Sequence, residues 1–297
     1  MDSHEITVVT HSGNFHPDDV FAVATLRLLL ENTHSIVVIR TRDKALIDSA
    51  DYVVDVGGEY DPVRKRFDHH QHGGAGKRDN GVDYASFGLV WKEFGSQITS
   101  PEIAQKMDQV VVQPIDALDN GFQFLESKVK NLYPYDIGMI FDAFKPTWKE
   151  GGVDKDKLFM ELVELAMKIL RREIIKKRDK LEARELVEKA YATASDKRLV
   201  VLDTHLPYSE VLDQYPEPLF VVFPRDDEYW VLQTVQNDSF MFTNRKDLPE
   251  AWAGKSYDDL VRITGVDEAV FCHSKRFIAV AKTKEGILKM AHIALNS

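Results

Sequence analysis

The chain has a single cysteine among its 297 residues, so no disulfide can form within it. Such sparse cysteine use is typical of proteins in a reducing compartment. The apolar flanks of Cys272, Val270-Phe271 and Phe277-Ile278, predict a buried strand thiol and not a nucleophile. Cysteine chemistry is therefore not expected to carry the function.

Long apolar runs and an excess of positive charge are also missing. No stretch approaches the ~20 apolar residues that a membrane span needs. Lysine and arginine number 38 against 48 acidic residues, and the net charge of −10 argues against broad nucleic-acid binding, although it leaves room for a local basic channel. The start of the chain has neither a basic leader nor an arginine-rich transit pattern. We expect a cytoplasmic protein, with the nucleus as a second location.

The length and composition are sufficient for two globular domains. The chain is 44% hydrophobic and 29% charged, which is typical of a globular protein. Strand and helix patterns alternate along the first half, with strands at 5–10, 35–40 and 52–55 and a helical pattern at 18–30. This alternation predicts an α/β fold whose mainly parallel sheet is flanked by helices. Ligands of such sheets lie beyond the carboxyl ends of the strands.

One long, charged helical pattern separates two regions of different composition. We expect a catalytic domain at 1–153, a helical linker at 154–195 and a smaller α+β domain at 196–297. The linker is interpreted as a solvated connecting helix, although its basic residues could face an acidic partner, and it is a candidate surface for homo-oligomer formation. In the last domain we expect hairpins at 219–235 and 271–280 and a final helix from Lys284.

The most informative motif is Asp68-His69-His70, which places a carboxylate and two imidazoles on consecutive residues after a strand end. Adjacent residues of a strand point to opposite faces, so the three side chains converge only if the chain turns there. Such a turn is unfavourable unless a metal or an anionic substrate fills it. The motif therefore makes a metal site the leading hypothesis.

Two upstream strand ends carry the same kinds of side chain. His11, His16 and Asp18 lie within eight residues on one strand-to-helix turn. Capping of the helix explains Asp18 or Asp19, but it explains neither histidine. Asp55 follows consecutive valines, where a carboxylate is costly to bury unless it is paired or metal-bound. An aspartate before two glycines is also typical of a simple turn.

A further aspartate, Asp116 or Asp119, ends a helical run at 115–121, and spacing alone does not choose between them. Mixed carboxylate and imidazole ligands suit Mn²⁺, Fe²⁺ or Zn²⁺ better than Mg²⁺. Two divalent ions can activate a water and hold a phosphoryl group for in-line attack, so the residues predict phosphoester hydrolysis. The candidate ligands, too many for one ion and about right for two, are His11, His16, Asp18, Asp55, Asp68, His69 and Asp119.

Five segments in this order resemble the DHH phosphoesterase superfamily and, within it, the melanocyte-proliferating-gene (Myg) family of exonucleases. Any one segment alone is a weak signal, whereas five in order are a strong one. All of them lie in the first 121 residues. They are Thr10–Asp18, Arg40–Asp43, Val53–Pro62, Phe67–Gln71 and Asp116–Gly121.

The resemblance implies a parallel-sheet domain that binds two divalent ions, usually Mn²⁺, and a DHH-associated domain that holds the substrate. It implies that Asp55 bridges the ions and that His70 contacts the scissile phosphate. Many DHH enzymes have aspartate where this chain has His16, a difference shared with the Myg family that could shift metal preference toward softer ions. The remaining implied ligands are His11, His16 and Asp18 of the first motif, Asp68 and His69 of the third, and Asp119.

Two basic segments are candidates for substrate binding. His273, Lys275 and Arg276 lie in a segment that resembles the closing segment of the family, although Ala279-Val280-Ala281 replaces the usual Gly-Gly-His. They could bind a phosphate or a chain end, or simply be surface charge. Lys77 and Arg78, in the glycine-rich loop 73–81, could steer an anionic substrate or be solvated.

We therefore expect a two-metal phosphodiesterase that acts as a 3′→5′ exonuclease on RNA or short oligonucleotides, with Asp68 and His70 as catalytic residues. The exonuclease activity and the RNA substrate rest on the resemblance, whereas the residues themselves support metal-dependent phosphoester hydrolysis. One alternative is a small-molecule phosphohydrolase such as a pyrophosphatase. Another is a non-catalytic metal-binding regulatory protein.

Overall fold

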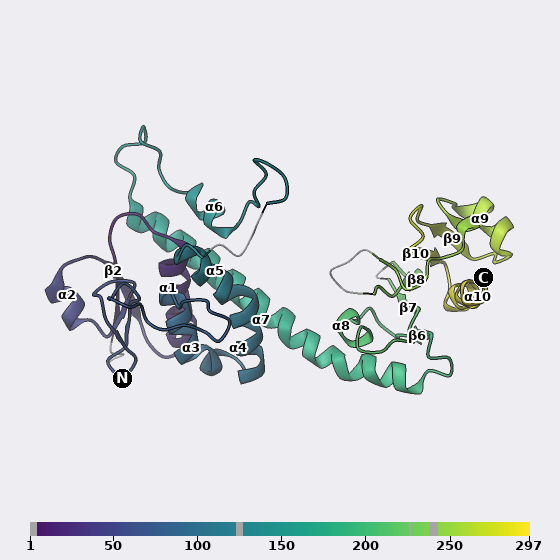
Figure 1. Cartoon of the computed structure of the whole chain (residues 1–297), viewed down its shortest axis with the longest axis horizontal. Helices are drawn as coiled ribbons and strands as arrows, with labels where there is room; N and C mark the ends of the chain where they lie inside the picture. Colours follow the sequence, from purple (N-terminus) through teal and green to yellow (C-terminus); the bar gives the residue numbers. More distant parts are fainter. Residues whose placement is uncertain (1–4, 123–126, 226, 238–242) are drawn as a thin grey trace. The chain divides into compact units, whose positions relative to one another are not determined.

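The computed structural model describes residues 5–122, 127–225, 227–237 and 243–297 (Figure 1). The chain divides into two compact units, Met1–Lys177 and Arg178–Ser297. The boundary falls inside α7 (Lys155–Thr193), an unbroken helix where the sequence predicts the linker. The division into three parts stays a prediction. Within the described ranges, no helix combines the length and apolar character that crossing a bilayer requires.

The N-terminal sheet has the strand order β2-β1-β3-β5-β4. Four of its strands are parallel and only β4 runs antiparallel, against β5, which confirms a mixed α/β fold with a mainly parallel N-terminal sheet. The β-branched residues of the central strands are buried, as expected for a sheet covered on both faces. The strands are β1 (Ile6–Thr10), β2 (Ile36–Arg40), β3 (Tyr52–Val54), β4 (Tyr60–Asp61) and β5 (Arg66–Phe67).

Aromatic side chains join the helices of this unit. Phe21 of α1 lies 5.3 Å, between ring centroids, from Phe87 of α3 and stacks at 5.8 Å on Phe141 of α6. The helical sequence pattern at 103–112 does not form one regular α-helix. Helix α4 ends at Met107, and a π-helical segment, Asp108–Val112, precedes α5. The helices are α1 (Pro17–Leu30), α2 (Lys44–Ser49), α3 (Ser86–Ile98), α4 (Pro101–Met107), α5 (Gln113–Asp119) and α6 (Ile137–Asp142).

The C-terminal unit is built on a second sheet, with the order β6-β7-β8-β10-β9. The predicted hairpins are confirmed, because β7 pairs antiparallel with β8, and β9 with β10. Its strands are β6 (Leu199–Val201), β7 (Phe220–Pro224), β8 (Trp230–Thr234), β9 (Ala269–Cys272) and β10 (Ile278–Ala281). Its short helices are α8 (Ser209–Leu212), the 3₁₀ turn η2 (Glu250–Trp252) and α9 (Tyr257–Thr264).

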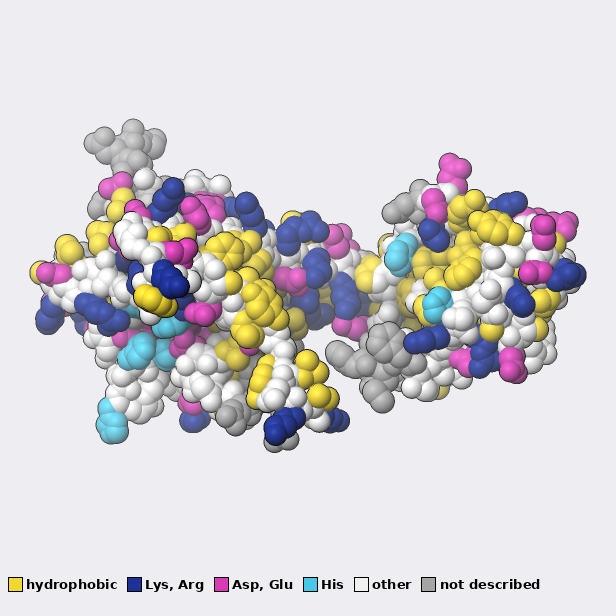
Figure 2. Space-filling view, turned by 90° about the horizontal axis from the view of Figure 1, so that it is seen from above, with side chains coloured by type: hydrophobic (Ala, Val, Ile, Leu, Met, Phe, Trp, Pro, Cys, Tyr) yellow, Lys and Arg dark blue, Asp and Glu magenta, His cyan; other side chains and the backbone are white. Residues whose placement is uncertain are grey.

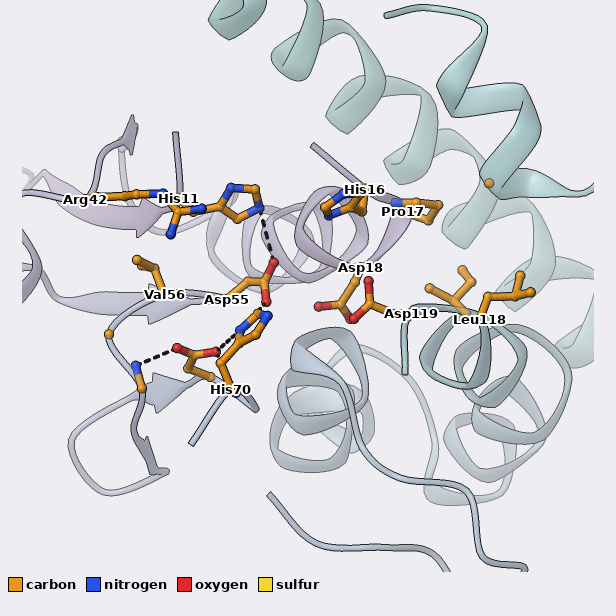
Figure 3. A pocket seen from close by; sticks show the side chains of 15 residues that line it. His11, His16, Pro17, Asp18, Arg42, Asp55, Val56, His70, Leu118 and Asp119 are labelled. Carbon is orange, nitrogen blue, oxygen red and sulfur yellow. Dashed lines mark hydrogen bonds and ion pairs between the residues drawn. The ribbon is translucent and has the colours of Figure 1, made fainter. Parts of the chain in front are cut away.

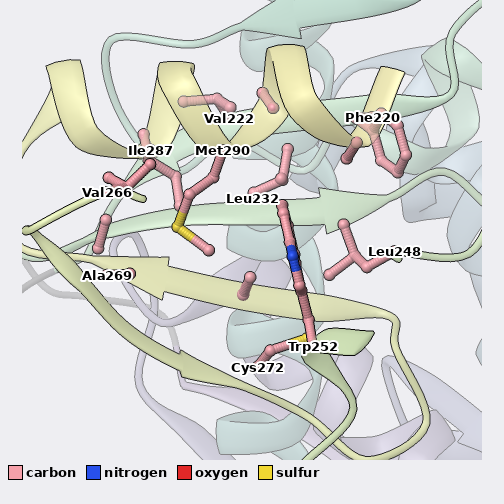
Figure 4. Packing of buried hydrophobic residues seen from close by; sticks show 14 of the residues in the cluster. Phe220, Val222, Leu232, Leu248, Trp252, Val266, Ala269, Cys272, Ile287 and Met290 are labelled. Atoms are coloured by element: carbon pink, nitrogen blue, oxygen red, sulfur yellow. The ribbon is translucent and has the colours of Figure 1, made fainter. Parts of the chain in front are cut away.

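The terminal helix α10 (Lys284–Asn296) covers one face of this sheet. Its Ile287 and Met290 are fully buried against strand residues such as Leu232, and Trp252 closes the same core (Figure 4). Cys272 lies in this core, which confirms the predicted buried thiol.

Candidate metal centre

Six of the seven predicted ligands line one pocket of about 670 Å³ (Figure 3). The seventh, His69, does not line it but contacts the lining residues Asp55 and Asp119. The carboxyl ends of β1, β3 and β5 supply His11, Asp55 and Asp68, as parallel strands place side chains at a common edge. Helix α5 ends at Asp119 and completes the ring. Figure 3 shows the carboxylates of Asp18 and Asp119 side by side.

The turn after β1 divides its two aspartates between two helices. Asp19 Oδ1 accepts the backbone N–H of His16 at 2.8 Å, so Asp19 performs the capping of α1 that the sequence left to either residue. Asp18 turns the other way and accepts the N–H groups of Ser86 and Phe87, at 3.1 and 2.7 Å. Asp18 is fully buried and joins the start of α1 to the start of α3.

Asp55 lies at the centre of the pocket. Its φ of 54° is in the left-handed region, which aspartate tolerates better than most side chains. Its Oδ2 lies 3.3 Å from His11 Nε2 and its Oδ1 lies 3.3 Å from His69 Nε2. Burial acts to raise the pKa of Asp55, but hydrogen bonding to the two histidines outweighs burial and holds that pKa well below its usual range.

The candidate ligand atoms form two neighbouring groups, which are joined by a contact between Asp55 and His69. His11, His16 and Asp55 offer atoms that all lie within 4.8 Å of one another, and so do Asp18, His69 and Asp119. Asp55 and His69 also group with His70, which connects the two sets. Each group could hold a metal ion, and Asp55 lies at the border between them.

The imidazoles are oriented for binding through Nε2. His11 Nδ1 lies 3.2 Å from the carbonyl oxygen of Ser12, an acceptor, so the proton belongs on Nδ1. His69 Nδ1 lies 3.3 Å from Asn120 Oδ1 in the same way. His69 Nε2 is buried and lies 3.2 Å from Asp119 Oδ2 and 3.3 Å from Asp55 Oδ1, so it faces the carboxylates that would share a cation with it.

The charges of the pocket also favour a cation. Burial acts to lower the pKa of His69, but hydrogen bonds to Asp119 and Asp55 raise it to about 11. Burial, followed by the charges of Asp119 and Asp55, raises the pKa of Asp18 well above its ordinary value. Figure 2 shows histidine side chains gathered beside acidic ones on this unit. Divalent ions would offset the repulsion among the carboxylates, so the donor set fits the predicted metals.

Asp68 has a different environment from the other candidates. Its Oδ2 accepts the N–H of Gly58 at 2.6 Å, and its Oδ1 lies 2.7 Å from His70 Nδ1. Asp68 therefore falls outside both ligand groups and orients His70 instead. The His70 side chain is 62% exposed and reaches the pocket, where it can meet a substrate.

The two basic loop residues differ from each other. Arg78 is not a free cation that could face a substrate, because its side chain is 6% exposed and lies 2.7 Å from both Asp116 and Asp108. Asp116 is thereby paired with Arg78, whereas Asp119 lies in one of the groups that could hold a metal ion, so the geometry favours Asp119 over Asp116 as the candidate ligand. Lys77 is exposed and pairs with Asp83 at 3.0 Å.

Arg42 also lines the pocket, although the sequence patterns indicate no role for it. It follows the end of β2, at the same sheet edge as the ligands, and Figure 3 shows it on the His11 side. Among the residues that the structure describes, it has no ion-pair partner, unlike Arg40, which pairs with Asp156 at 2.7 Å. Its position just after a strand end could have predicted a place in the pocket, because ligands of parallel sheets lie beyond the carboxyl ends of the strands. The roles of Ser86 and Asn120, which respectively hydrogen-bond to Asp55 and lie beside His69, were also not predicted.

The predicted substrate residues of the C-terminal unit lie at the turn between β9 and β10. The ring centroids of His273 and Phe277 are 4.5 Å apart, and Arg276 pairs with Asp247 at 2.7 Å. Lys275 is exposed. Their roles in substrate binding stay predictions.

Comparisons with known proteins bear on the whole chain. A MYG1 protein from Dictyostelium discoideum is 32% identical over 98% of this chain and 97% of its own length. A human protein named MYG1 exonuclease is 32% identical over 96% of this chain and 85% of its own length. A solved structure, an exopolyphosphatase-related protein from Bacteroides fragilis, is 15% identical over 99% of this chain and 92% of its own, with a TM-score of 0.25. The family model MYG1_exonuc, described as an uncharacterised protein family (UPF0160), matches residues 7–295. The chain therefore belongs to the MYG1 family.

Proposed function

We propose that this chain is a divalent-metal-dependent phosphoesterase that acts as a 3′→5′ exonuclease on RNA or short oligonucleotides. The observation that carries the proposal is the pair of adjacent ligand groups bordered by Asp55. The human relative named an exonuclease supports a nucleic-acid substrate.

The two groups would hold two cations, and mixed nitrogen and oxygen donors favour Mn²⁺ over Mg²⁺. One group is His11, His16 and Asp55, and the other is Asp18, His69 and Asp119, with Asp55 adjacent to both. Bound divalent ions lower the pKa of a coordinated water and polarise phosphoryl oxygens.

The side chains outside the ligand groups would act on the substrate. His70 is held through Nδ1 by Asp68, which leaves Nε2 to donate to a phosphate oxygen or to the leaving oxygen. The Gly58 N–H fixes Asp68 in turn. Arg42 adds a guanidinium that can bind a second phosphate oxygen with charge-assisted hydrogen bonds.

The charge of the molecule favours short substrates bound by their ends. With a net charge of −10, a long duplex lying across the surface would be repelled. A single strand that enters the pocket end-on meets the cations, His70 and Arg42 at one place. This favours an exonuclease over an endonuclease.

The test is hydrolysis of RNA labelled at its 3′ or its 5′ end by the full chain, with Mn²⁺ or with EDTA. Stepwise loss from the 3′ end, abolished by EDTA, is expected. Asp119→Asn should lower the rate by about 100-fold or more, because even residues that only support a metal ligand contribute 10- to 100-fold. Asp48→Asn, an exposed aspartate on α2, is the matched control. Full activity of Asp119→Asn would contradict the site, and turnover of pyrophosphate alone would indicate a small-molecule phosphohydrolase.

A further inference from the structure

The C-terminal unit has a second concavity, of about 400 Å³, that the metal centre does not use. Its floor is apolar, formed by Phe223 of β7, Val231 of β8 and Ile278 of β10. Its rim carries His205 and Arg225, and Gln233 also lines it. Figure 2 shows histidine side chains beside exposed hydrophobic ones on this unit.

The rim and floor form a flat aromatic stack. The rings of His205 and Phe223 lie 4.4 Å apart between centroids and 9° from parallel. Phe223 is buried and fixed among core residues, whereas His205 is exposed on top of it. The stack presents an aromatic surface that is already ordered before any ligand arrives, and such surfaces bind planar rings.

Polar groups beside the stack are suited to a heterocycle that carries an anion. The Gln233 amide is half-buried and has no hydrogen-bond partner among the described residues, so both its donor and its acceptor are available. Arg225 pairs with Asp227 at 2.8 Å, but both side chains are about half exposed, 48% and 45%. A solvated pair of this kind is weak, and the guanidinium can exchange its partner for a phosphate.

We propose that this concavity binds a nucleobase of a single-stranded nucleic acid, and this inference rests on the proposed function. The base stacks on His205, Gln233 reads its hydrogen-bonding edge, and Arg225 meets the adjacent phosphate. A purely apolar ligand would leave the Gln233 amide unpaired, and an acidic peptide would use Arg225 but not the stack. The combination favours a nucleotide over either.

The test compares His205→Ala and Gln233→Leu with the full wild-type chain. The matched control is His292→Ala, an exposed histidine of α10 that does not line this concavity. Affinity for a fluorescein-labelled single-stranded RNA is measured by anisotropy in EDTA, where hydrolysis cannot interfere. His205→Ala should weaken binding by about 5- to 150-fold, the range that one stacked base contributes. Gln233→Leu should weaken binding by about 2- to 10-fold, the range that one hydrogen bond contributes. The control should bind like wild type.

Hydrolysis of bis(p-nitrophenyl) phosphate, which has no nucleobase, separates this inference from the proposed function. Unchanged turnover of this compound by the variants, together with weaker RNA binding, would support the inference. RNA binding equal to wild type in both pocket variants would overturn it, as would equal weakening by His292→Ala. If the wild type hydrolyses neither substrate but the variants still lose RNA binding, the base site stands and the phosphoesterase proposal fails.

Discussion

Asp55 combines an unusual backbone conformation with a carboxylate that faces two imidazoles. Asparagine tolerates the same left-handed backbone and has the same shape, but it carries no charge. We expect Asp55→Asn to fold, to bind fewer Mn²⁺ ions and to lose about 100-fold or more of the phosphoesterase rate. Isothermal titration calorimetry with Mn²⁺ and the rate on labelled RNA check this.

Asp61→Asn, at a half-exposed position of β4, provides the comparison for Asp55→Asn. An Asp55→Asn protein that keeps both the wild-type stoichiometry and the wild-type rate would rule out a bridging role for Asp55.

Substitution of Asp68 tests whether this residue binds a metal ion or orients His70. Because its two oxygens accept from Gly58 and His70, Asp68→Asn should leave the Mn²⁺ affinity within a few-fold of wild type. The turnover number should fall by about 10- to 100-fold, since His70 would lose its orientation. Calorimetry and steady-state kinetics on the same preparations separate the two effects. Loss of Mn²⁺ binding would instead show that Asp68 is a ligand, as the family resemblance implies.

The candidate ligands could be predicted from local sequence, but the contacts of the basic residues in loop 73–81 could not. His11, Asp55 and His69 follow strand ends, so their convergence followed from the parallel sheet alone. Arg78 could not be placed in this way, because its partners Asp108 and Asp116 lie 30 and 38 residues further along the chain. Pairing over such separations depends on how α3 and α5 pack, which periodicity does not determine.

Helices α1 and α3 meet through Asp18, which accepts two N–H groups at the start of α3. Removal of a capping carboxylate costs about 1–2 kcal/mol. We expect Asp18→Ala to lower the free energy of unfolding of the metal-free protein by about that amount, measured by urea denaturation in EDTA. Asp119→Ala is the control, since the described contacts of Asp119 include no cap. Equal stability of the two variants would contradict the capping role.

Strands and long helices were predictable at this scale, whereas short and irregular elements were not. The β-branched runs of β1 and β7 strongly predict strands, and the long helical pattern of α7 strongly predicts a helix. Helix α8 spans only four residues, too few for a clear period. Helix α9 spans eight residues and was not predicted although its buried residues, Leu260 and Thr264, lie one turn apart on one face. The π-helical segment at Asp108–Val112 lies between two helices and breaks no residue pattern, so it read as continuous helix.

At the scale of the whole molecule, the reactivity of the one cysteine, Cys272, reports whether the C-terminal core is folded. Burial, slightly opposed by Arg276, raises the pKa of its thiol to about 11. A raised pKa lowers the thiolate fraction below that pH, to roughly one in a thousand at pH 8, and the side chain is also covered. We expect iodoacetamide to react very slowly with the native protein at pH 8 and rapidly in 6 M guanidinium. Mass spectrometry of the modified chain checks this, and fast native labelling would show that the C-terminal core opens readily.

Gly88 of α3 lies against the buried pair formed by Arg78 and Asp116. Its N–H donates to Asp116 at 3.0 Å, and a Cβ at this position would overlap Asp116 Oδ2 and lie 2.8 Å from Arg78 Nη2. No side chain fits there while the ion pair is intact. Positions 78, 88 and 116 should therefore vary together among related chains: where a relative has any residue other than glycine at 88, the arginine or the aspartate should have changed as well.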